Sequence, residues 1–359
     1  MLILALLSAA WGHDAIGSIA QRPLFAGTEL VGAHTSWGLV LDEGGSWERV
    51  CEEALPGLRD AARHRDGAVW LATSDGVRTA VEGGCDTEPI PTPQPVVDAF
   101  VAIEDDIFGL APEGVFVAKG GADPSPCGPL PGTVHDLATA DGALWAAGTD
   151  GTPWLRHSAD GCATWTDVPL PEPDATFVEL HGEALGGVLH TTWRADGGSG
   201  VWVLTPSGAT SLGGLDQPPS ALACIDGLCL VATNRSGLTR FDPGPGTASL
   251  EEVPDGPAAC LWAHDGRLWA CTDVDEADHF WSTEDADTWT GWLPREAVVE
   301  RACPAASTGA AACDGSVDTG SPRDTAAGSG GLQLQDDPGC GCSEAVSPTG
   351  LTSLLARRR

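Results

Sequence analysis

Short apolar segments separated by tight polar turns fill most of the chain between residues 26 and 305. The clearest pattern is an Asp-Gly pair followed by an apolar run, found as DGAVWLAT (66–73), DGALWAAG (141–148), DGLCLVAT (226–233) and DGRLWACT (265–272). Weaker copies are DDIFGLAP (105–112) and GGVLHTTW (186–193), and LVGAHTSW (30–37) begins the series. The seven units start 36 to 45 residues apart, a spacing typical of a repeated supersecondary unit.

Each unit is expected to form about four antiparallel strands. Several units have a second tight turn after the Asp-Gly run, followed by another apolar segment, and no helical periodicity lies between them. In the run 143–147 both faces are apolar, because Ala143, Trp145 and Ala147 alternate with Leu144 and Ala146. Such a strand must be covered on both sides, so we predict that it is the inner strand of a β-propeller blade.

The repeats therefore predict an all-β fold, a single β-propeller domain of seven four-stranded blades from Ala26 to Ala305. Six or eight blades are the alternatives, because the first and last units can share strands to close the ring. We expect three further segments outside the propeller: a signal peptide (1–12), a linker (306–337) and a C-terminal tail (338–359).

A third turn in three of the units carries a recurring polar motif that ends in Trp. The copies are DEGGSW with Asp42, Gly44, Ser46 and Trp47; SADGCATW with Ser158, Asp160, Thr164 and Trp165; and STEDADTW with Ser282, Glu284, Thr288 and Trp289. In the last copy Glu284 and Ala286 stand in place of Asp and Gly. We expect the Asp to accept backbone N–H groups within the turn, Gly to take a positive φ and Trp to pack between sheets.

This motif resembles the Asp-box, and the chain resembles the Asp-box (BNR) β-propellers. That superfamily includes sialidases, photosystem II assembly factors and sortilin ectodomains. The resemblance implies that the box residues have a structural role, because the box punctuates the blades and does not itself form a binding site.

The N-terminus and the cysteines indicate an exported protein. Residues 2–10 form an apolar run that is too short to span a bilayer and is typical of a secretory signal peptide, although a buried first strand is the alternative. The chain has 12 Cys, a usage typical of an oxidising compartment. Two pairs are symmetric about an Asp-Gly turn, which predicts disulfides across hairpins. Cys224 and Cys229 would lie at a non-hydrogen-bonded position, and Cys260 and Cys271 at a hydrogen-bonded one.

The C-terminal part has a different composition. Residues 306–337 are rich in Gly, Ser, Thr and Asp and poor in large apolar side chains, so we expect a disordered linker. Cys340 and Cys342 follow, then a weakly apolar segment and three terminal Arg. This order resembles the myxobacterial-type (MYXO-CTERM) sorting tail, which implies transient membrane association, processing near the Cys residues and attachment at the outer cell surface. An ordinary basic C-terminus is the alternative.

The charge and composition exclude several functions. Lys+Arg total 18 and Asp+Glu 51, so the formal net charge is −33, which is opposite to that of a nucleic-acid-binding protein. Because the chain has no Tyr, it cannot be a sialidase that uses a Tyr nucleophile. The nine His lack metal-binding spacing, and no nucleophile-elbow or P-loop motif occurs. No cofactor is required by any motif.

Acidic residues gather in the turns that are expected to follow the second strand of each blade. They are Asp75, Glu113, Asp150, Asp196, Asp273, Asp275, Glu276 and Asp278. If these turns form a rim around the central channel, they would favour Ca²⁺ or a cationic partner. The alternative is that they only keep an acidic secreted protein soluble.

These observations predict a secreted, surface-attached, monomeric propeller that serves as a non-catalytic binding or scaffold module. Its partner would be an extracellular protein, a glycan or Ca²⁺. The alternative function is a hydrolase or lyase of polysaccharides that uses paired carboxylates in the propeller channel.

Overall fold

The computed structural model describes the chain in segments. They are residues 20–35, 38–42, 44–51, 55, 57–64, 67–81, 84–94, 97–103, 106–111, 114–120, 122–215, 219–225, 228–233, 237–241, 250–252, 258–272 and 278–300. They belong to one compact unit, Ser18–Val317. The predicted signal peptide, linker and sorting tail, with Cys340 and Cys342, lie outside the described residues. No helix that is long and apolar enough to cross a membrane occurs in the described segments.

The fold is an all-β propeller of antiparallel sheets, in which the chain runs through the strands of each sheet in order. The first strands are β1 (Ala20–Ala26), β5 (Asp60–Arg63), β9 (Ala99–Ile103), β13 (Thr133–Ala140), β17 (Phe177–Ala184), β21 (Ala221–Ile225) and β25 (Ala258–His264). The second strands are β2 (Glu29–Thr35), β6 (Val69–Thr73), β10 (Asp106–Ala111), β14 (Ala143–Thr149), β18 (Gly187–Trp193), β22 (Leu228–Thr233) and β26 (Arg267–Thr272).

The outer half of each sheet is built in the same way. The third strands are β3 (Gly38–Asp42), β7 (Gly76–Val81), β11 (Gly114–Lys119), β15 (Pro153–Ser158), β19 (Ser199–Thr205), β23 (Gly237–Phe241) and β27 (Asp278–Thr283). The fourth strands are β4 (Trp47–Cys51), β8 (Asp86–Pro89), β12 (Ser125–Pro126), β16 (Thr166–Val168), β20 (Gly208–Leu215), β24 (Leu250–Glu252) and β28 (Thr290–Pro294).

The sheet that begins with β1 departs from this plan. After the 3₁₀ turn η3 (Arg295–Ala297), the last described strand, β29 (Val298–Glu300), pairs in parallel with β4 and becomes a fifth strand. The described residues thus form six four-stranded sheets and one five-stranded sheet, so the prediction of seven four-stranded blades is not met in full. Strand β1 begins at Ala20, earlier than the predicted start of the repeats at Ala26.

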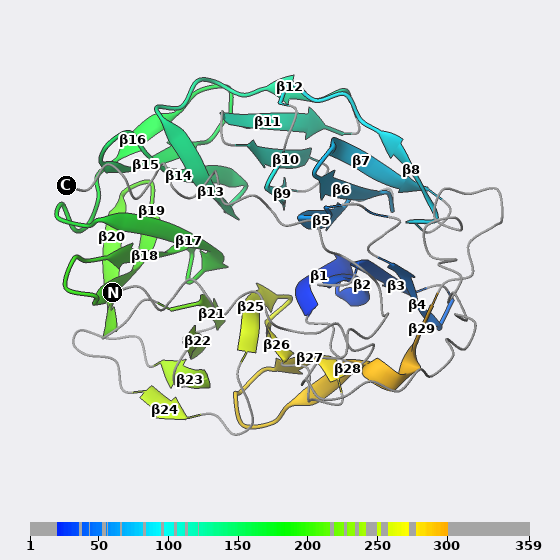
Figure 1. Cartoon of the computed structure of the whole chain (residues 1–359). Helices are drawn as coiled ribbons and strands as arrows, with labels where there is room; N and C mark the ends of the chain where they lie inside the picture. The colour runs from blue at the N-terminus through cyan, green and yellow to red at the C-terminus, as the bar shows by residue number, and fades with distance from the viewer. Residues whose placement is uncertain are drawn as a thin grey trace, which may run out of the picture. The chain divides into compact units, whose positions relative to one another are not determined.

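The sheets are arranged around a common centre (Figure 1). Each first strand contacts the first strand of the next sheet, from β1 through β5, β9, β13, β17 and β21 to β25, and β25 contacts β1 again. The first strands are therefore the innermost strands, and they form a closed ring. The strand after Asp-Gly is the second strand, next to the innermost one, and it is apolar on both faces because a neighbouring sheet packs against each side, as expected for an inner strand.

Hydrophobic clusters fill the spaces between neighbouring sheets. For example, Phe108 and Leu110 of β10 pack with Leu137 of β13 and Leu144 of β14. Another cluster joins the last sheet to the first, where Trp269 contributes from β26. Since burial of such side chains is the main stabilising contribution, each sheet depends on both of its neighbours.

Two of the predicted Asp-Gly turns have the backbone that a tight hairpin needs. Asp141 and Gly142 have φ of 50° and 70°, and Asp265 and Gly266 have φ of 48° and 68°. Two successive positive φ values define a type I′ turn, whose twist matches that of the strands it joins. Asp226-Gly227 lies outside the described residues.

Both predicted disulfides are present. The Cα atoms of Cys224 and Cys229 are 4.1 Å apart and those of Cys260 and Cys271 are 5.0 Å apart. The shorter and longer separations follow the expected order for a non-hydrogen-bonded and a hydrogen-bonded pair. A third disulfide, Cys127–Cys162, was not predicted, because it joins two neighbouring sheets across 35 residues. Cys85 is disulfide-bonded as well.

Candidate functional site: the central cavity

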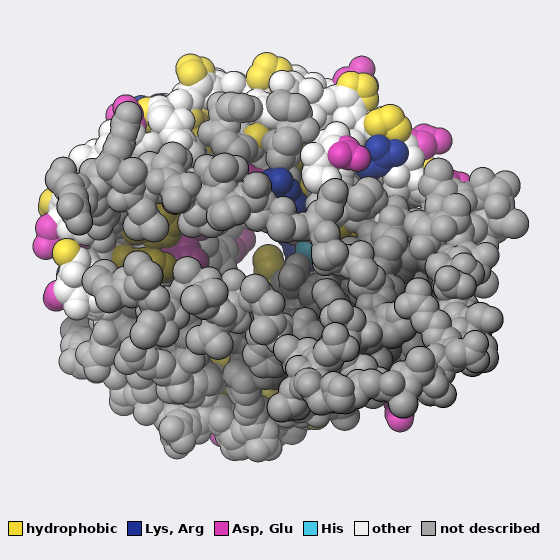
Figure 2. Space-filling model, viewed as in Figure 1, with side chains coloured by type: hydrophobic (Ala, Val, Ile, Leu, Met, Phe, Trp, Pro, Cys, Tyr) yellow, Lys and Arg dark blue, Asp and Glu magenta, His cyan; other side chains and the backbone are white. Residues whose placement is uncertain are grey.

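The first strands of all the sheets surround a cavity of about 660 Å³. Its wall includes Arg22 from β1, Asp60 from β5, Phe100 from β9, Asp136 from β13, His181 from β17 and Trp262 from β25. Figure 2 shows an opening at the centre of the drawn face, with basic and His side chains beside it. A cavity of this size can hold a small molecule or a peptide side chain.

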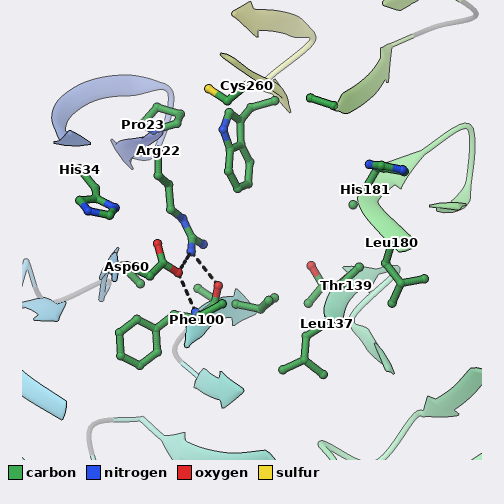
Figure 3. Close-up of a pocket in the computed structure, with 18 of the residues that line it drawn as sticks. Arg22, Pro23, His34, Asp60, Phe100, Leu137, Thr139, Leu180, His181 and Cys260 are labelled. Carbon is green, nitrogen blue, oxygen red and sulfur yellow. Dashed lines mark hydrogen bonds and ion pairs between the residues drawn. The ribbon is translucent and has the colours of Figure 1, made fainter. Parts of the chain in front are cut away.

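The most connected group in the wall is the guanidinium of Arg22. Its Nη1 donates to Oδ2 of Asp60 and, at 2.8 Å, to the carbonyl oxygen of Phe100 (Figure 3). The guanidinium also lies 5.2 Å from the ring centroid of Trp262, in a cation–π contact. One side chain therefore links four sheets around the cavity.

The carboxylate of Asp60 also has several hydrogen-bond partners. Its Oδ1 accepts the N–H of Ala61 at 2.9 Å, and its Oδ2 accepts the N–H of Phe100, on the next inner strand, at 2.7 Å. The carboxylate thus joins β5 to β9 through the backbone and to β1 through Arg22. Hydrogen bonds to charged groups are stronger than neutral ones, so this arrangement fixes the relative position of three inner strands.

Asp136 repeats this arrangement two sheets further on. Its Oδ1 accepts the N–H of Leu137 at 2.9 Å, and its Oδ2 accepts the N–H of Leu180, on the next inner strand, at 2.6 Å. No basic side chain of the described residues forms an ion pair with it. Burial raises the pKa of Asp136 to about 7, and the nearby Glu179 carboxyl contributes to this shift.

Glu179 lies on β17, next to the Asp136 contact. Burial raises the pKa of Glu179 to about 7 as well, against the opposing effect of the nearby Trp193 side chain. Two carboxyl groups with raised pKa values thus lie on adjacent inner strands. Within the described residues, no Arg or Lys forms an ion pair with either of them, whereas Arg22 pairs with Asp60.

Burial lowers the pKa of two histidines of the cavity wall, His181 and His34. His181 lies 3.0 Å from Oγ1 of Thr191, and burial lowers the pKa of His181 to about 3. Burial also lowers the pKa of His34, which is 3% exposed. His264 stacks on Phe25, with ring centroids 3.8 Å apart, and contacts the Gly27 carbonyl oxygen.

Two further arginines line the cavity. Arg59 forms an ion pair with Asp98, and both side chains are 43% exposed. Arg63 forms no ion pair within the described residues. The wall therefore combines buried and exposed charged groups, most of which already have a protein partner.

The described members of the predicted acidic rim are not among the residues that line this cavity. Asp75, Asp150 and Asp196 lie in the exposed turns between second and third strands, and Asp278 is the first residue of β27. Glu113, Asp273, Asp275 and Glu276 are outside the described residues. Where the structure is described, no group of three or more His, Cys, Asp or Glu side chains could hold a metal ion.

The polar motifs ending in Trp lie in turns between third and fourth strands. Asp160 accepts the N–H of Thr164 at 2.9 Å and hydroxyl groups from Thr164 and Ser158. Similarly, Asp42 accepts the N–H of Gly45 at 2.7 Å, and Gly44 has a positive φ of 67°. Three Trp side chains of these motifs pack into clusters shared with the preceding sheet, namely Trp47, Trp165 and Trp289.

The turn after β27 is shifted by one residue from the frame that the sequence suggested. Asp285, and not Glu284, accepts the N–H groups of Asp287 and Thr288, at 2.9 and 2.8 Å. Thr283, and not Ser282, donates to this carboxylate. Glu284 instead forms an ion pair with Arg267. The φ of Ala286 is 64°, so an alanine occupies a position where glycine is easier to accommodate.

Comparisons with known proteins agree with the fold. No family model and no curated protein matches the sequence. The extracellular domain of BT4673 from B. thetaiotaomicron is similar in structure, with a TM-score of 0.54 and 14% identity. The match covers 72% of this chain and 37% of that one, so the chain spans well under half of its length.

Two smaller propellers match over most of their length. The WD40 β-propeller domain of Doa1 has a TM-score of 0.51 at 10% identity, and the match covers 75% of this chain and 92% of that domain. YCF48 bound to D1 peptide has a TM-score of 0.50 at 11% identity, with coverage of 71% and 93%. The fold is therefore shared with known β-propellers. Identities this low carry no information about the ligand.

Arg22, Asp60 and Asp136 are absent from the predicted site residues, which were placed in the turns. A signal was present: Asp60 and Asp136 each lie a few residues before an Asp-Gly pair, at Asp66-Gly67 and Asp141-Gly142. A carboxylate within an otherwise apolar strand must be hydrogen-bonded or paired if it is buried. The sequence could not show which backbone groups serve as its partners.

Proposed function

We propose that this protein is an exported, non-catalytic binding module that holds its ligand in the central cavity. The observation that carries this proposal is the cavity of about 660 Å³, whose wall is supplied by the first strands of all the sheets. Its position is fixed by hydrogen bonds and ion pairs between inner strands, such as those of Arg22 and Asp60. A cavity that is already formed favours binding, because little conformational entropy is lost when the ligand enters.

The rival function, a polysaccharide hydrolase or lyase, has one observation in its favour. The pKa of Asp136 is raised to about 7, as a general acid requires. However, both oxygens of Asp136 accept backbone N–H groups, which leaves its proton poorly placed for transfer to a substrate. Asp60 is likewise engaged by Arg22. Neither carboxyl group is therefore placed to act as a general acid, and binding is the better supported function.

Export is supported by the cysteines. Three disulfides are described in full and Cys85 is in a disulfide too, a usage typical of an oxidising compartment. The apolar run at 2–10 and the MYXO-CTERM-like order at 338–359 support a protein displayed at the outer cell surface. The Asp-box-like turns around Asp42 and Asp160 support membership of the Asp-box propellers. The ligand would then be an extracellular protein or glycan.

A glycan array, combined with a reducing-sugar assay on each glycan that is bound, tests the function. We expect retention of one class of extracellular ligand without release of new reducing ends. Appearance of new reducing ends, abolished by Asp136→Asn, would establish the hydrolase instead. Calorimetric titration with Ca²⁺, with thermal melts with and without a chelator, tests whether the rim residues bind the ion.

A further inference from the structure

We infer that the cavity wall at Asp136 is a subsite for the guanidinium group of a ligand, which takes the place that Arg22 takes at Asp60. This inference rests on the proposed binding function and names the chemistry of the ligand. The ligand is an alkylguanidinium, either as a small molecule or as the Arg side chain of a peptide.

The two carboxylates have the same local geometry. In each, Oδ1 accepts the N–H of the following residue at 2.9 Å, Ala61 for Asp60 and Leu137 for Asp136. In each, Oδ2 accepts an N–H from the next inner strand, at 2.7 Å for Asp60 and 2.6 Å for Asp136. Both residues line the same cavity. What surrounds Asp60 therefore indicates what the carboxylate of Asp136 can accept.

The two sites differ in one group. Oδ2 of Asp60 also accepts Nη1 of Arg22, and that nitrogen donates in addition to the carbonyl oxygen of Phe100. Oδ2 of Asp136 has no such partner among the described side chains, although a carboxylate oxygen has room for a second donor. Strand β9 precedes the strand of Asp136 in the ring, as β1 with Arg22 precedes the strand of Asp60. The wall residues that β9 supplies are Ala99, Phe100, Val101 and Ala102, and none of them is basic.

The surroundings favour a cation over any other ligand group. Glu179 on β17 adds a second carboxyl beside Asp136, and the coulombic interaction between the two disfavours their joint ionisation. A ligand cation would relieve this repulsion and compensate the buried charge. The net charge of −33 attracts cations to the whole molecule.

A guanidinium fits this subsite better than an ammonium. Its planar set of N–H donors can reach a carboxylate and a neighbouring carbonyl at the same time, as Arg22 does. Across the cavity from Arg22, Leu137, Leu180 and His181 form the opposite wall (Figure 3). The Asp136 subsite thus faces the same space as Arg22, and a side chain that enters the cavity could reach it.

Isothermal titration calorimetry on the full chain tests the subsite with three probes. They are acetyl-Gly-Arg-Gly-amide, the same peptide with citrulline in place of Arg, and N-butylguanidinium. Citrulline has the shape of Arg without its charge, so we expect the Arg peptide to bind at least about tenfold more tightly. Binding of N-butylguanidinium as well would show that the group alone suffices, and binding of the peptide only would identify a peptide ligand.

Two variants locate the binding. Asp136→Asn should lower the affinity for the Arg peptide about tenfold, because it removes the charge from the acceptor. Asp98→Asn is the matched control: it removes the same charge from the same cavity wall, but at a carboxylate that already pairs with Arg59, and should leave affinity within about twofold. Equal losses in both variants would overturn the subsite in favour of general attraction to the acidic cavity.

Proton release gives a readout that needs no variant. A bound guanidinium favours the ionised carboxylate, so binding at pH 6 to 7 should release a proton from Asp136, measured from titrations in buffers of different ionisation heat. The titratable groups on the strands packed against β13 are Asp106 on β10, Lys119 on β11, Glu179, His181 and Glu183 on β17 and His190 on β18, with His135 on β13 itself; β9 and β14 carry none. Glu179→Gln separates the contribution of Glu179, and release should persist in that variant.

Failure of the inference and failure of the proposed function give different results. If the Arg peptide binds no better than the citrulline peptide, or binds without proton release, the guanidinium subsite is wrong. A glycan bound on the array would still support the binding module in that case. If new reducing ends appear on the array, the binding module itself is overturned.

Discussion

Arg22 donates across the boundary between two sheets to the carboxylate of Asp60, at the wall of the central cavity. The two side chains are only 17% and 10% exposed. A second Arg–Asp pair, Arg59 with Asp98, lies in the same wall with both side chains 43% exposed. The two pairs have the same chemistry and differ in burial, so they allow the contribution of burial to be measured.

Replacing Arg22 with Met should destabilise the protein strongly. It leaves Asp60 with a buried charge that no cation compensates, and loss of one partner of a buried pair costs about 3 to 5 kcal/mol. Arg59→Met is the control and should cost about 0 to 1 kcal/mol, since its pair is open to solvent. Urea unfolding measures both. Equal effects would show that burial of the Arg22 pair is not what matters.

The stability of the protein should depend on pH through Asp136. The pKa of this carboxyl is about 7 in the folded state, against 3.8 for an unperturbed Asp. Between these values the folded state keeps a proton that the unfolded state has released, so the free energy of unfolding falls as pH rises. Asp136→Asn removes this dependence, at the cost of about 1 kcal/mol for one lost hydrogen bond. As the pH rises from about 4 to 7, the free energy of unfolding of the variant should therefore increase relative to that of the wild type, as measured by chemical denaturation.

The other shifted groups are the same in both proteins, so they cancel in this comparison. Glu179 acts in the same direction as Asp136, and His181 and His190, with pKa values lowered to about 3 and 4, act in the opposite direction. Asp160 supplies a contrast, because hydrogen bonds from Thr164 and Ser158 lower the pKa of Asp160 to about 2. Asp160→Asn should alter the pH dependence only below about pH 4. If the difference in free energy of unfolding between the wild type and Asp136→Asn does not change with pH, the raised pKa of Asp136 is contradicted.

In the turn after β27, the residue that the sequence motif marks as the acceptor is not the residue that accepts hydrogen bonds in the structure. Alignment with the other copies gives Glu284 the acceptor role, but Asp285 accepts the N–H groups of Asp287 and Thr288. Asp285→Ala should therefore lower the melting temperature, because these N–H groups lose their acceptor. Glu284→Ala removes only an exposed ion pair with Arg267 and should leave the melting temperature nearly unchanged. A larger fall in melting temperature for Glu284→Ala than for Asp285→Ala would instead support Glu284 as the acceptor.

The disulfides should differ in their contributions to stability according to the chain length that each closes. Cys127–Cys162 spans 35 residues and Cys224–Cys229 spans 5. In the chain-entropy model these crosslinks contribute about 4 and about 2 kcal/mol respectively. Thermal melts of the Cys127→Ala/Cys162→Ala and Cys224→Ala/Cys229→Ala double variants measure the difference. A larger loss for the hairpin pair would show that packing of the buried Cys224 and Cys229 outweighs chain entropy.

The repeated pattern of the sequence was enough to predict a β-propeller. Tight turns at Asp141-Gly142 and Asp265-Gly266, and the two hairpin disulfides, follow from local geometry, because both partners lie within about ten residues. The pattern predicted an inner strand after each Asp-Gly pair, but it did not by itself identify the innermost strand. A strand that is apolar on both faces can be either a first or a second strand, and only the packing of neighbouring sheets distinguishes these positions.

The candidate site lay beyond the reach of the sequence for the same reason. Asp60 and Asp136 appear as single acids within apolar strands, and their partners Phe100 and Leu180 are 40 and 44 residues away. Backbone N–H groups are present in almost every residue, so no side-chain pattern marks which of them a carboxylate will meet. Arg22 is 38 residues from Asp60, and nothing around it forms a motif.

By itself, the sequence determined the local features: apolar runs, type I′ turns, hairpin disulfides and the strongly acidic composition. These depend on interactions between residues that are close along the chain. The tertiary structure decided which strand is innermost, where the acidic turns lie and which carboxylates line the cavity. Those outcomes depend on closing the ring, which brings residues from every sheet to one centre, and ring closure is a property of all the sheets together.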